Sequence, residues 1–173
     1  MDVLRAVKGR RSIRAFRNQD VSEETVEKLL EAGTWSPSAG NIQSWEFVIV
    51  RKPDIKEKLV EAAWGQSFIA EATVVVVVCA NNDRSSERYG DRGATLYCIQ
   101  DTAAAVQTIL LVAHSIGLGT CWIGAFDEDA VREVIRAPNG VRPVAIVPLG
   151  HPAETPRPRE RRPLAQIVHR ETF

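Results

Sequence analysis

The sequence predicts an α+β fold, and three observations support this prediction. Segments with helical periodicity and short apolar runs of strand length follow one another without the regular βαβ alternation of a doubly wound fold. One segment of helical length is apolar nearly all round, which is typical of a helix at the centre of a fold. The chain of 173 residues is long enough for a substantial core, so we expect residues 1–173 to form a single domain.

The first half of the chain gives signals for both helices and strands. Ser22 is a good N-cap for a helix that Gly33 would end, and Pro53 suits the first turn of another. A run of five valines from Val74 predicts a strand that is covered on both faces. These signals predict helices over residues 2–8, 22–32 and 53–64, strands over 45–50 and 73–80, and a loop over 34–44.

The second half contains the longest helix signal. Residues 81–92 are polar and predict a mobile segment, whereas residues 93–116 predict the apolar central helix. Asp101 lies inside this helix, and we interpret it as a buried partner for another helix or an arginine. In so small a domain, burying such a helix fully calls for a second subunit.

The end of the chain combines short elements with an extended arm. Asp127 is a suitable N-cap for a helix over residues 127–136, and strands are expected over 120–124 and 141–149. From His151 onward, four prolines prevent a compact element and predict an arm that reaches towards a partner.

Positive charge gathers at the two ends of the chain. The whole chain has 22 basic and 22 acidic residues, but residues 18–156 carry 11 basic and 19 acidic ones, a net charge of −8. The basic residues of the two ends are Arg5, Lys8, Arg10, Arg11, Arg14, Arg17, Arg157, Arg159, Arg161 and Arg162. Two cationic segments around an acidic body suit one compact anion better than nucleic acid or a membrane surface.

Several kinds of site are excluded by motif and spacing. The sequence contains no P-loop motif, and the glycines of residues 117–124 follow a helix signal, the opposite order to a dinucleotide fingerprint. His114, His151 and His169 are far apart and unpaired with cysteines, so no metal site is expected. The three cysteines indicate free thiols in a cytoplasmic protein, and no signal peptide or membrane span is expected.

Polar loops around the apolar body carry groups that are suited to binding a nucleotide. The arginines of residues 10–14 suit phosphate oxygens, and Ser12 adds a hydroxyl and a backbone N–H. The side-chain amides of Asn41 and Gln43 offer both a donor and an acceptor to the polar edge of a ring. An exposed glycine lets a backbone N–H approach a flat ligand closely.

Five segments in one order make the chain resemble the nitroreductase family of FMN-dependent oxidoreductases. They are RRSIRAF from Arg10, WSPSAGNIQSWEFVIV from Trp35, EATVVVVVCA from Glu71, QDTAAAVQTILLVAHSIGLGTCWIGAF from Gln100 and RPRERRPL from Arg157. Each segment alone is a weak signal, but the five together cover nearly the whole chain.

The resemblance implies an architecture and an activity. The sheet would be mixed or antiparallel and flanked by helices, with the long helix at a homodimer interface and the C-terminal arm on the partner subunit. One FMN would bind at each of two interface sites. A ping-pong reaction would take electrons from NAD(P)H and reduce a small acceptor, nitroaromatic or quinone-like, by hydride transfer through flavin N5.

The resemblance also gives roles to individual residues. The backbone N–H of Gly124 would point at flavin N5, and Gln66 would touch the pyrimidine edge. Ser38, Ala39 and Asn41 would contact the flavin of the other subunit. The residues expected to bind FMN are Arg10, Arg11, Ser12, Arg14, Pro37, Ser38, Ala39, Asn41, Gln43, Gln66, Ile123, Gly124, Arg159 and Arg161.

Two other functions stay open at this point. One is a flavin-binding carrier, sensor or regulatory protein without turnover. The other is a branch of the family that performs reductive dehalogenation or oxidative flavin cleavage. The chain has a glycine at position 124, where larger members of the family have a glutamate, and its segment 81–92 is short, so the resemblance does not specify the acceptor.

Overall fold

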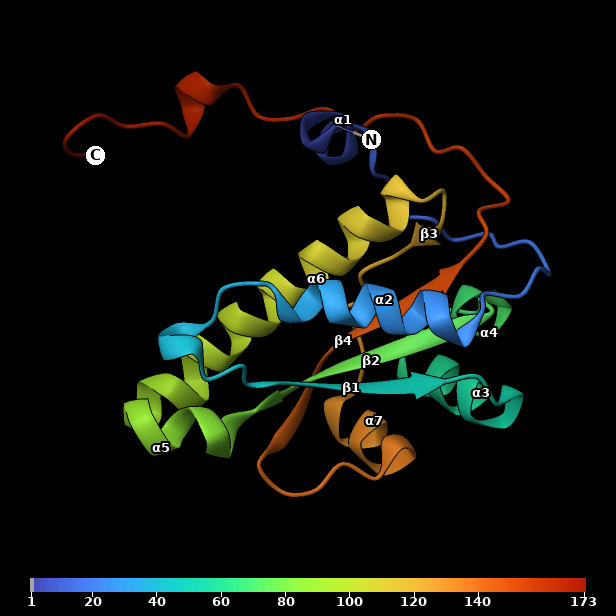
Figure 1. Cartoon of the computed structure of the whole chain (residues 1–173), viewed down its shortest axis with the longest axis horizontal. Helices are drawn as coiled ribbons and strands as arrows, with labels where there is room; N and C mark the ends of the chain where they lie inside the picture. The colour runs from blue at the N-terminus through green and yellow to red at the C-terminus, as the bar shows by residue number, and fades with distance from the viewer. Residues whose placement is uncertain (1) are drawn as a thin grey trace.

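The structure, a computed structural model, describes residues 2–173 and has three layers (Figure 1). Helices α2 (Glu23–Thr34) and α6 (Cys98–Ser115) cover one face of a four-stranded sheet, and α3 (Pro53–Ala62) and α7 (Glu128–Ile135) cover the other. The strands run in the order β1-β2-β4-β3, and each neighbouring pair is antiparallel. Their bounds are Trp45–Val50 (β1), Val74–Asn81 (β2), Gly119–Thr120 (β3) and Val141–Gly150 (β4). The predicted α+β class and antiparallel sheet are therefore confirmed.

Strand β2 lies at the centre of the core, as its valines predict. Val74, Val76 and Val78 pack towards α2 and α6, while Val75 and Val77 pack towards α3 and α7. All five side chains are buried, because alternate residues of a strand face opposite sides of the sheet. Each buried valine contributes about 1.5–3 kcal/mol to folding, so this strand is a main source of stability.

The helix N-termini confirm the predicted caps. The Ser22 hydroxyl accepts a hydrogen bond from the Thr25 N–H at 3.2 Å, and the Asp127 carboxylate accepts one from the Ala130 N–H at 3.0 Å. Each satisfies a backbone donor that the first turn of a helix leaves free. A further short helix, α1 (Val3–Gly9), is capped in the same way by Asp2.

The prediction that residues 81–92 are mobile was wrong. They form helix α5 (Asn82–Arg92), which is kinked at Gly90 (φ 54°) and continues through a π-helical turn, Gly93–Tyr97, into α6. The Asn81 side chain caps α5 by accepting a hydrogen bond from the Arg84 N–H at 2.9 Å. Polar composition does not prevent a helix whose N-terminus is capped and whose arginines bind the neighbouring loop.

Other short elements also differ from the sequence prediction. The strand expected over residues 120–124 is limited to β3, although Ile123 still exchanges two backbone hydrogen bonds with Ile146, at 2.9 and 3.0 Å. Three one-turn elements were not predicted: the 3₁₀ turn Ala39–Asn41, α4 (Phe68–Glu71) and the 3₁₀ turn Leu164–Gln166.

The helical run from Asn82 to Ser115, which is kinked at Gly90, is long and apolar enough to cross a membrane by length and composition alone. The core helix of a globular protein passes the same test. Here α6 packs against α2 and the sheet through residues that include Val106, Ile109 and Leu110. Eight of the 18 residues of α6 are buried, so packing within the chain accounts for part of its apolar character.

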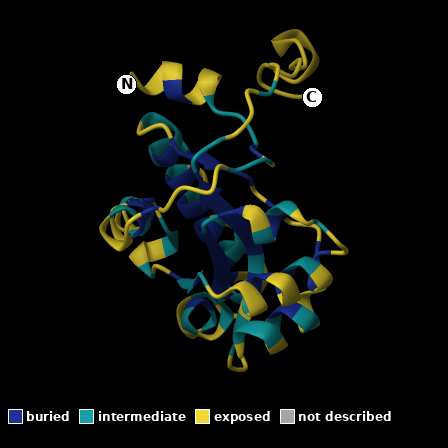
Figure 2. Ribbon diagram, turned by 90° about the vertical axis from the view of Figure 1, so that its right-hand side faces the viewer, coloured by how far each residue is buried: buried dark blue, intermediate teal, exposed yellow. Residues whose placement is uncertain are grey.

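The two chain ends project from the body (Figure 2). Helix α1 exposes Val3, Leu4 and Val7, and the segment after β4 runs past α1 as an extended, exposed arm. Its extended backbone follows from its prolines, as predicted. That the arm lies on a partner subunit stays a prediction.

Candidate functional site

The N-terminal segment that follows α1 is extended and pairs with the end of the sheet. Ser12 bridges to Thr120 in parallel, and the Ile13 N–H donates a hydrogen bond to the Thr120 carbonyl at 2.9 Å. Ile13 is buried in the core, so its alternate neighbours Ser12 and Arg14 face the other way. Gly119 permits this close approach, because a Cβ there would lie 2.9 Å from the Ile13 side chain.

The C-terminal segment runs beside the N-terminal one. The Arg17 N–H donates to the His151 carbonyl at 2.8 Å, and the Ala153 N–H donates to the Ala15 carbonyl at 2.9 Å. These bonds join residues that are more than 130 positions apart in sequence. They bring the arginines of the tail alongside those that follow α1.

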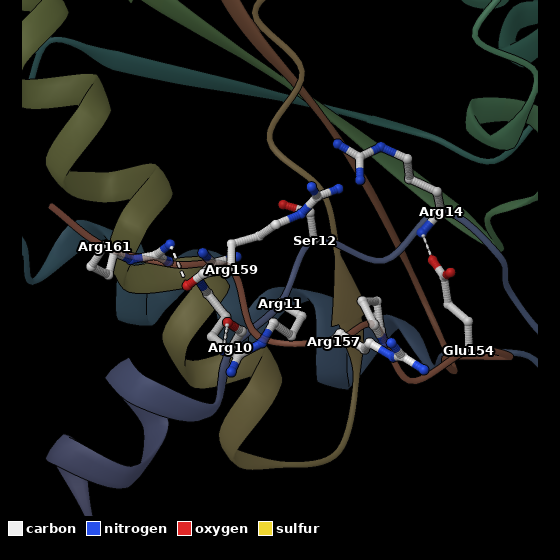
Figure 3. Close-up of a pocket in the computed structure, with 9 residues that line it drawn as sticks. Arg10, Arg11, Ser12, Arg14, Glu154, Arg157, Arg159 and Arg161 are labelled. Atoms are coloured by element: carbon white, nitrogen blue, oxygen red, sulfur yellow. Dashed lines mark hydrogen bonds between the residues drawn. The ribbon is translucent and has the colours of Figure 1, made fainter.

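The two segments enclose a cavity of about 370 Å³, which we call the anion cavity (Figure 3). Its lining is Arg10, Arg11, Ser12, Arg14, Glu154, Pro156, Arg157, Arg159 and Arg161. Six of the nine residues carry a guanidinium group, which donates several N–H groups in a planar fork. The cavity is therefore built to receive an oxyanion such as a phosphate.

The charges around the cavity are not balanced within the chain. The pKa of Arg10 is lowered, first by burial and then by the like charges of Arg11 and Arg161. Glu154 is the acidic residue among the described residues that line the cavity, and its carboxylate accepts a hydrogen bond from the Arg14 N–H. A bound dianion would offset the repulsion between the arginines, so the electrostatics of the cavity favour the binding of a dianion.

Arg14 connects the anion cavity to the short helix α4. Its guanidinium carbon lies 5.8 Å from the centre of the Phe68 ring, within the range of a cation–π contact. Gln66 lies just before this helix, and its side-chain amide donates to the Ala125 carbonyl at 3.0 Å. Ala125 directly follows Gly124, so a continuous strip of residues leads from the arginines to Gly124.

Gly124 presents an open backbone. The residue is exposed, and a Cβ added to it would meet no atom within 4 Å. The fold of one chain therefore does not itself require glycine here. A missing side chain in open space leaves room for a flat ligand to approach the backbone N–H.

The loop that contains Pro37, Ser38, Ala39, Asn41 and Gln43 lies elsewhere. Asp101, near the start of α6, accepts hydrogen bonds from the Ala39 N–H and the Ser44 hydroxyl, each at 2.9 Å. His114, near the end of α6, lies against Gly9, next to the anion cavity. The helix rises about 1.5 Å per residue, so the thirteen steps along α6 from Asp101 to His114 separate the loop from the cavity by about 20 Å.

Comparison with known proteins identifies the family. The profile of the Nitroreductase family matches residues 7–68 and 62–151. The chain belongs to the nitroreductase family. The family match covers most of the chain, including the N-terminal arginines, the loop after α2, and Gly124.

Named relatives and solved structures agree with this membership. A candidate NADH dehydrogenase/NAD(P)H nitroreductase from Methanothermobacter thermautotrophicus is 39% identical over 164 residues, which cover 92% of this chain and 82% of the relative. The FMN reductase [NAD(P)H] of Bacillus subtilis is 29% identical over 185 residues, with coverages of 99% and 74%. The crystal structure of nitroreductase A from Vibrio parahaemolyticus superposes with a TM-score of 0.92 at 27% identity, covering 100% of this chain and 77% of that chain.

The structure groups the residues selected from the sequence into three sets. Arg10, Arg11, Ser12, Arg14, Arg159 and Arg161 line the anion cavity. Gln66, Ile123 and Gly124 lie along the strip that begins at Arg14. The loop residues Pro37, Ser38, Ala39, Asn41 and Gln43 lie at the opposite end of α6.

Sequence reasoning missed three residues of the cavity. Pro156 and Arg157 were noted as parts of the C-terminal tail but not selected, and Glu154 was not considered at all. The antiparallel pairing of residues 15–17 with 151–153 places all three residues in the lining, and no local motif in the tail predicts that pairing.

Proposed function

We propose that this protein is an FMN-dependent oxidoreductase that oxidises NAD(P)H and reduces a small acceptor, nitroaromatic or quinone-like, in a ping-pong reaction. Family membership, together with relatives named FMN reductase and NAD(P)H nitroreductase, supports the oxidoreductase class, FMN as cofactor and NAD(P)H as donor. The acceptor and the ping-pong order are our proposal.

The observation that carries the proposal is the convergence of both chain ends on the anion cavity. Arg10, Ser12, Arg159 and Arg161 would hold the FMN phosphate, because guanidinium groups form paired hydrogen bonds with phosphate oxygens. Arg14 would lie near the polar edge of a bound flavin ring, where a positive charge would stabilise the anionic reduced form.

Gly124 would be the catalytic position. When bound, FMN supplies hydride transfer at N5, and the protein binds and orients it. The exposed Gly124 N–H would face N5, and Ile123, anchored on β4 through Ile146, fixes the residue before it.

The loop residues Pro37, Ser38, Ala39, Asn41 and Gln43 would come from a second copy of the chain. The separation along α6 leaves this loop about 20 Å from the anion cavity of its own chain. A homodimer that places the loop of one subunit beside the cavity of the other would bring them together. The apolar residues exposed on α1 and on the arm, among them Leu4 and Ile167, are suited to that interface.

Two experiments test the proposal. The purified protein should be yellow, should release FMN on denaturation, and its flavin absorbance should bleach when NADH or NADPH is added without oxygen. Colourless protein that takes up no added FMN would overturn the proposal. Bound flavin that neither donor bleaches would indicate a flavin-binding protein without turnover.

The phosphate site can be tested separately by comparing two flavins. Arg161→Ala should weaken FMN binding by about 1.5–3 kcal/mol, roughly 10- to 150-fold, because one charge-assisted hydrogen bond is lost. Riboflavin, which has no phosphate, should bind both proteins equally. Arg170→Ala is the matched control, because this exposed arginine does not line the cavity. Unchanged FMN affinity in Arg161→Ala would remove the proposed phosphate site.

A further inference from the structure

A cluster of two arginines and two tyrosines lies beside the loop that follows α2. The Arg88 guanidinium donates to the Gly40 carbonyl at 3.2 Å, and its carbon lies 5.5 Å from the centre of the Tyr89 ring. The Arg92 guanidinium donates to the Tyr97 hydroxyl at 3.0 Å, and its carbon lies 5.3 Å from the centre of that ring. The two rings meet edge to face with their centroids 5.2 Å apart, so the four side chains form one cluster.

The tyrosines, rather than helical spacing, connect the two arginines. Helix α5 is kinked at Gly90, with φ of 54° and ψ of −144°, a conformation that glycine adopts far more readily than other residues. The four-residue spacing of the arginines therefore does not place them on one helix face. Gly40 is also left-handed, with φ of 56°, and a Cβ there would lie 2.6 Å from the Tyr89 hydroxyl. The two glycines thus allow the cluster to pack directly on the loop.

The positive charges of Arg88 and Arg92 are not neutralised by contact. Both residues are exposed, and neither forms an ion pair within residues 2–173, although Glu87 and Asp91 directly precede them in the chain. Arg84 of the same helix differs, because its guanidinium pairs with a carboxylate of β1. In the hydrogen bonds of the described residues, the two exposed arginines each use one of the five N–H groups of a guanidinium. Their other N–H groups are available to an anion.

The proposed dimer would place this cluster at the edge of a flavin site. The loop that carries Ser38, Ala39 and Asn41 would contact the flavin of the other subunit, and α5 lies next to this loop (Figure 1). A donor that reduces the flavin lays its nicotinamide against the ring, so its adenosine half extends over the surface beside the ring. NADPH differs from NADH by a 2′-phosphate on that adenosine, and arginine is the side chain suited to bind it.

We propose that Arg88 and Arg92 bind the 2′-phosphate of NADPH and so make NADPH the preferred electron donor over NADH. This inference rests on the proposed function, because it assigns the donor of the same flavin site. The cation–π contacts hold both guanidinium groups in place before the donor arrives, so little side-chain freedom is lost on binding. The arginines act on the affinity for the donor and not on the hydride transfer itself.

The test compares both donors in the holoenzyme and in its variants Arg88→Gln and Arg92→Gln. Glutamine removes the positive charge but keeps side-chain N–H groups for the Gly40 carbonyl or the Tyr97 hydroxyl. The NADPH concentration that gives half the limiting rate of flavin reduction should rise about 10-fold in each variant, the lower end for a charge-assisted hydrogen bond, because both arginines are exposed. The value for NADH and the limiting rates with both donors should change by less than about twofold, because only binding to the 2′-phosphate is lost.

A binding measurement is independent of turnover. In titration calorimetry, adenosine 2′,5′-bisphosphate, which carries the 2′-phosphate but no nicotinamide, should bind each variant about 10-fold more weakly than the wild type. Adenosine 5′-phosphate, which lacks the 2′-phosphate, should bind all the proteins with equal affinity. Arg136→Gln is the matched control and should behave as the wild type, because this exposed arginine at the end of α7 lies outside the cluster.

Three outcomes would overturn the inference. An equal rise for NADPH and NADH would mean that the arginines hold the loop and not a phosphate. Unchanged values for NADPH and for the bisphosphate in both variants would remove the 2′-phosphate site. Equal half-saturating concentrations of NADPH and NADH in the wild type would show that the 2′-phosphate is not recognised. If the wild type bound FMN but neither donor reduced it, the proposed function would fail, while the bisphosphate titration would still decide whether the cluster binds a 2′-phosphate.

Discussion

Glu154 accepts a hydrogen bond from the backbone N–H of Arg14, and this contact places a carboxylate in the wall of the arginine-lined anion cavity (Figure 3). The bond joins the C-terminal segment to the N-terminal one and so helps to form the cavity. The same negative charge opposes any anion that enters. Glu154 therefore holds the Arg14 backbone in position but lowers the affinity of the cavity for an anion.

Glu154→Gln should tighten FMN binding. Glutamine keeps a carbonyl oxygen for the Arg14 N–H but removes the negative charge, and an exposed charge of this kind is worth about 0.2–1 kcal/mol, up to roughly fivefold in affinity. Fluorescence titration of the flavin-free protein measures the effect. Riboflavin affinity should stay the same, and equal tightening for both flavins would contradict an effect on the phosphate.

Asp101→Ala should destabilise the fold. Asp101 is 5% exposed, and its removal leaves the Ala39 N–H and the Ser44 hydroxyl without their acceptor. An unsatisfied buried donor costs about 1–3 kcal/mol, and the free energy of unfolding in urea should fall by at least that amount. Glu27→Ala, an exposed acid on α2, is the control and should change stability by less than about 0.5 kcal/mol. A loss no larger than that of the control would mean that the loop is held by other contacts.

The Asp101 contacts show how far sequence reasoning reaches. Its position in an apolar helix was enough to predict a buried partner role, and the structure confirms that role. Its partner is a loop rather than a helix or an arginine. The hydrogen bond to Ala39 joins residues 62 positions apart in the sequence, and such a distant contact leaves no local sequence signal. Local patterns predict the burial of a residue but not which distant segment it meets.

Helix α5 and the anion cavity illustrate the same limit. Residues 82–92 have the polar composition of a mobile segment, yet Arg84 donates to the Gln43 carbonyl at 2.8 Å and Arg88 to the Gly40 carbonyl at 3.2 Å. These long-range bonds stabilise a helix that local composition does not predict. Five of the six arginines of the cavity, all except Arg157, were selected because charge clustered at both chain ends is visible in the sequence, whereas the role of the single carboxylate Glu154 is not.

His114 should make stability depend on pH. Its pKa is lowered, first by burial and then by the positive charges of Arg10 and Arg11. The unfolded chain therefore binds a proton more readily than the folded one, so this contribution to stability is complete above the ordinary histidine pKa of about 6.5 and is lost as the pH falls below it. Urea unfolding at pH 8, 6.5 and 5 should show this loss. In His114→Gln, the part of the pH dependence that arises near pH 6 should be missing; an identical profile would contradict the assignment.

The three cysteines should be unreactive in the folded protein. Cys79, Cys98 and Cys121 are each at most 1% exposed, and burial raises the pKa of each thiol, that of Cys79 to about 12. Thiolate is the reactive form, so a disulfide reagent at pH 8 should label almost none of them until urea unfolds the chain, when all three should react. Glu57→Cys, which places a thiol on the exposed side of α3, supplies a rapidly labelled reference in the same fold. Rapid labelling of the wild-type chain without denaturant would show that one of these buried positions opens to solvent, with Cys121, next to the anion cavity, the first position to examine by mass spectrometry.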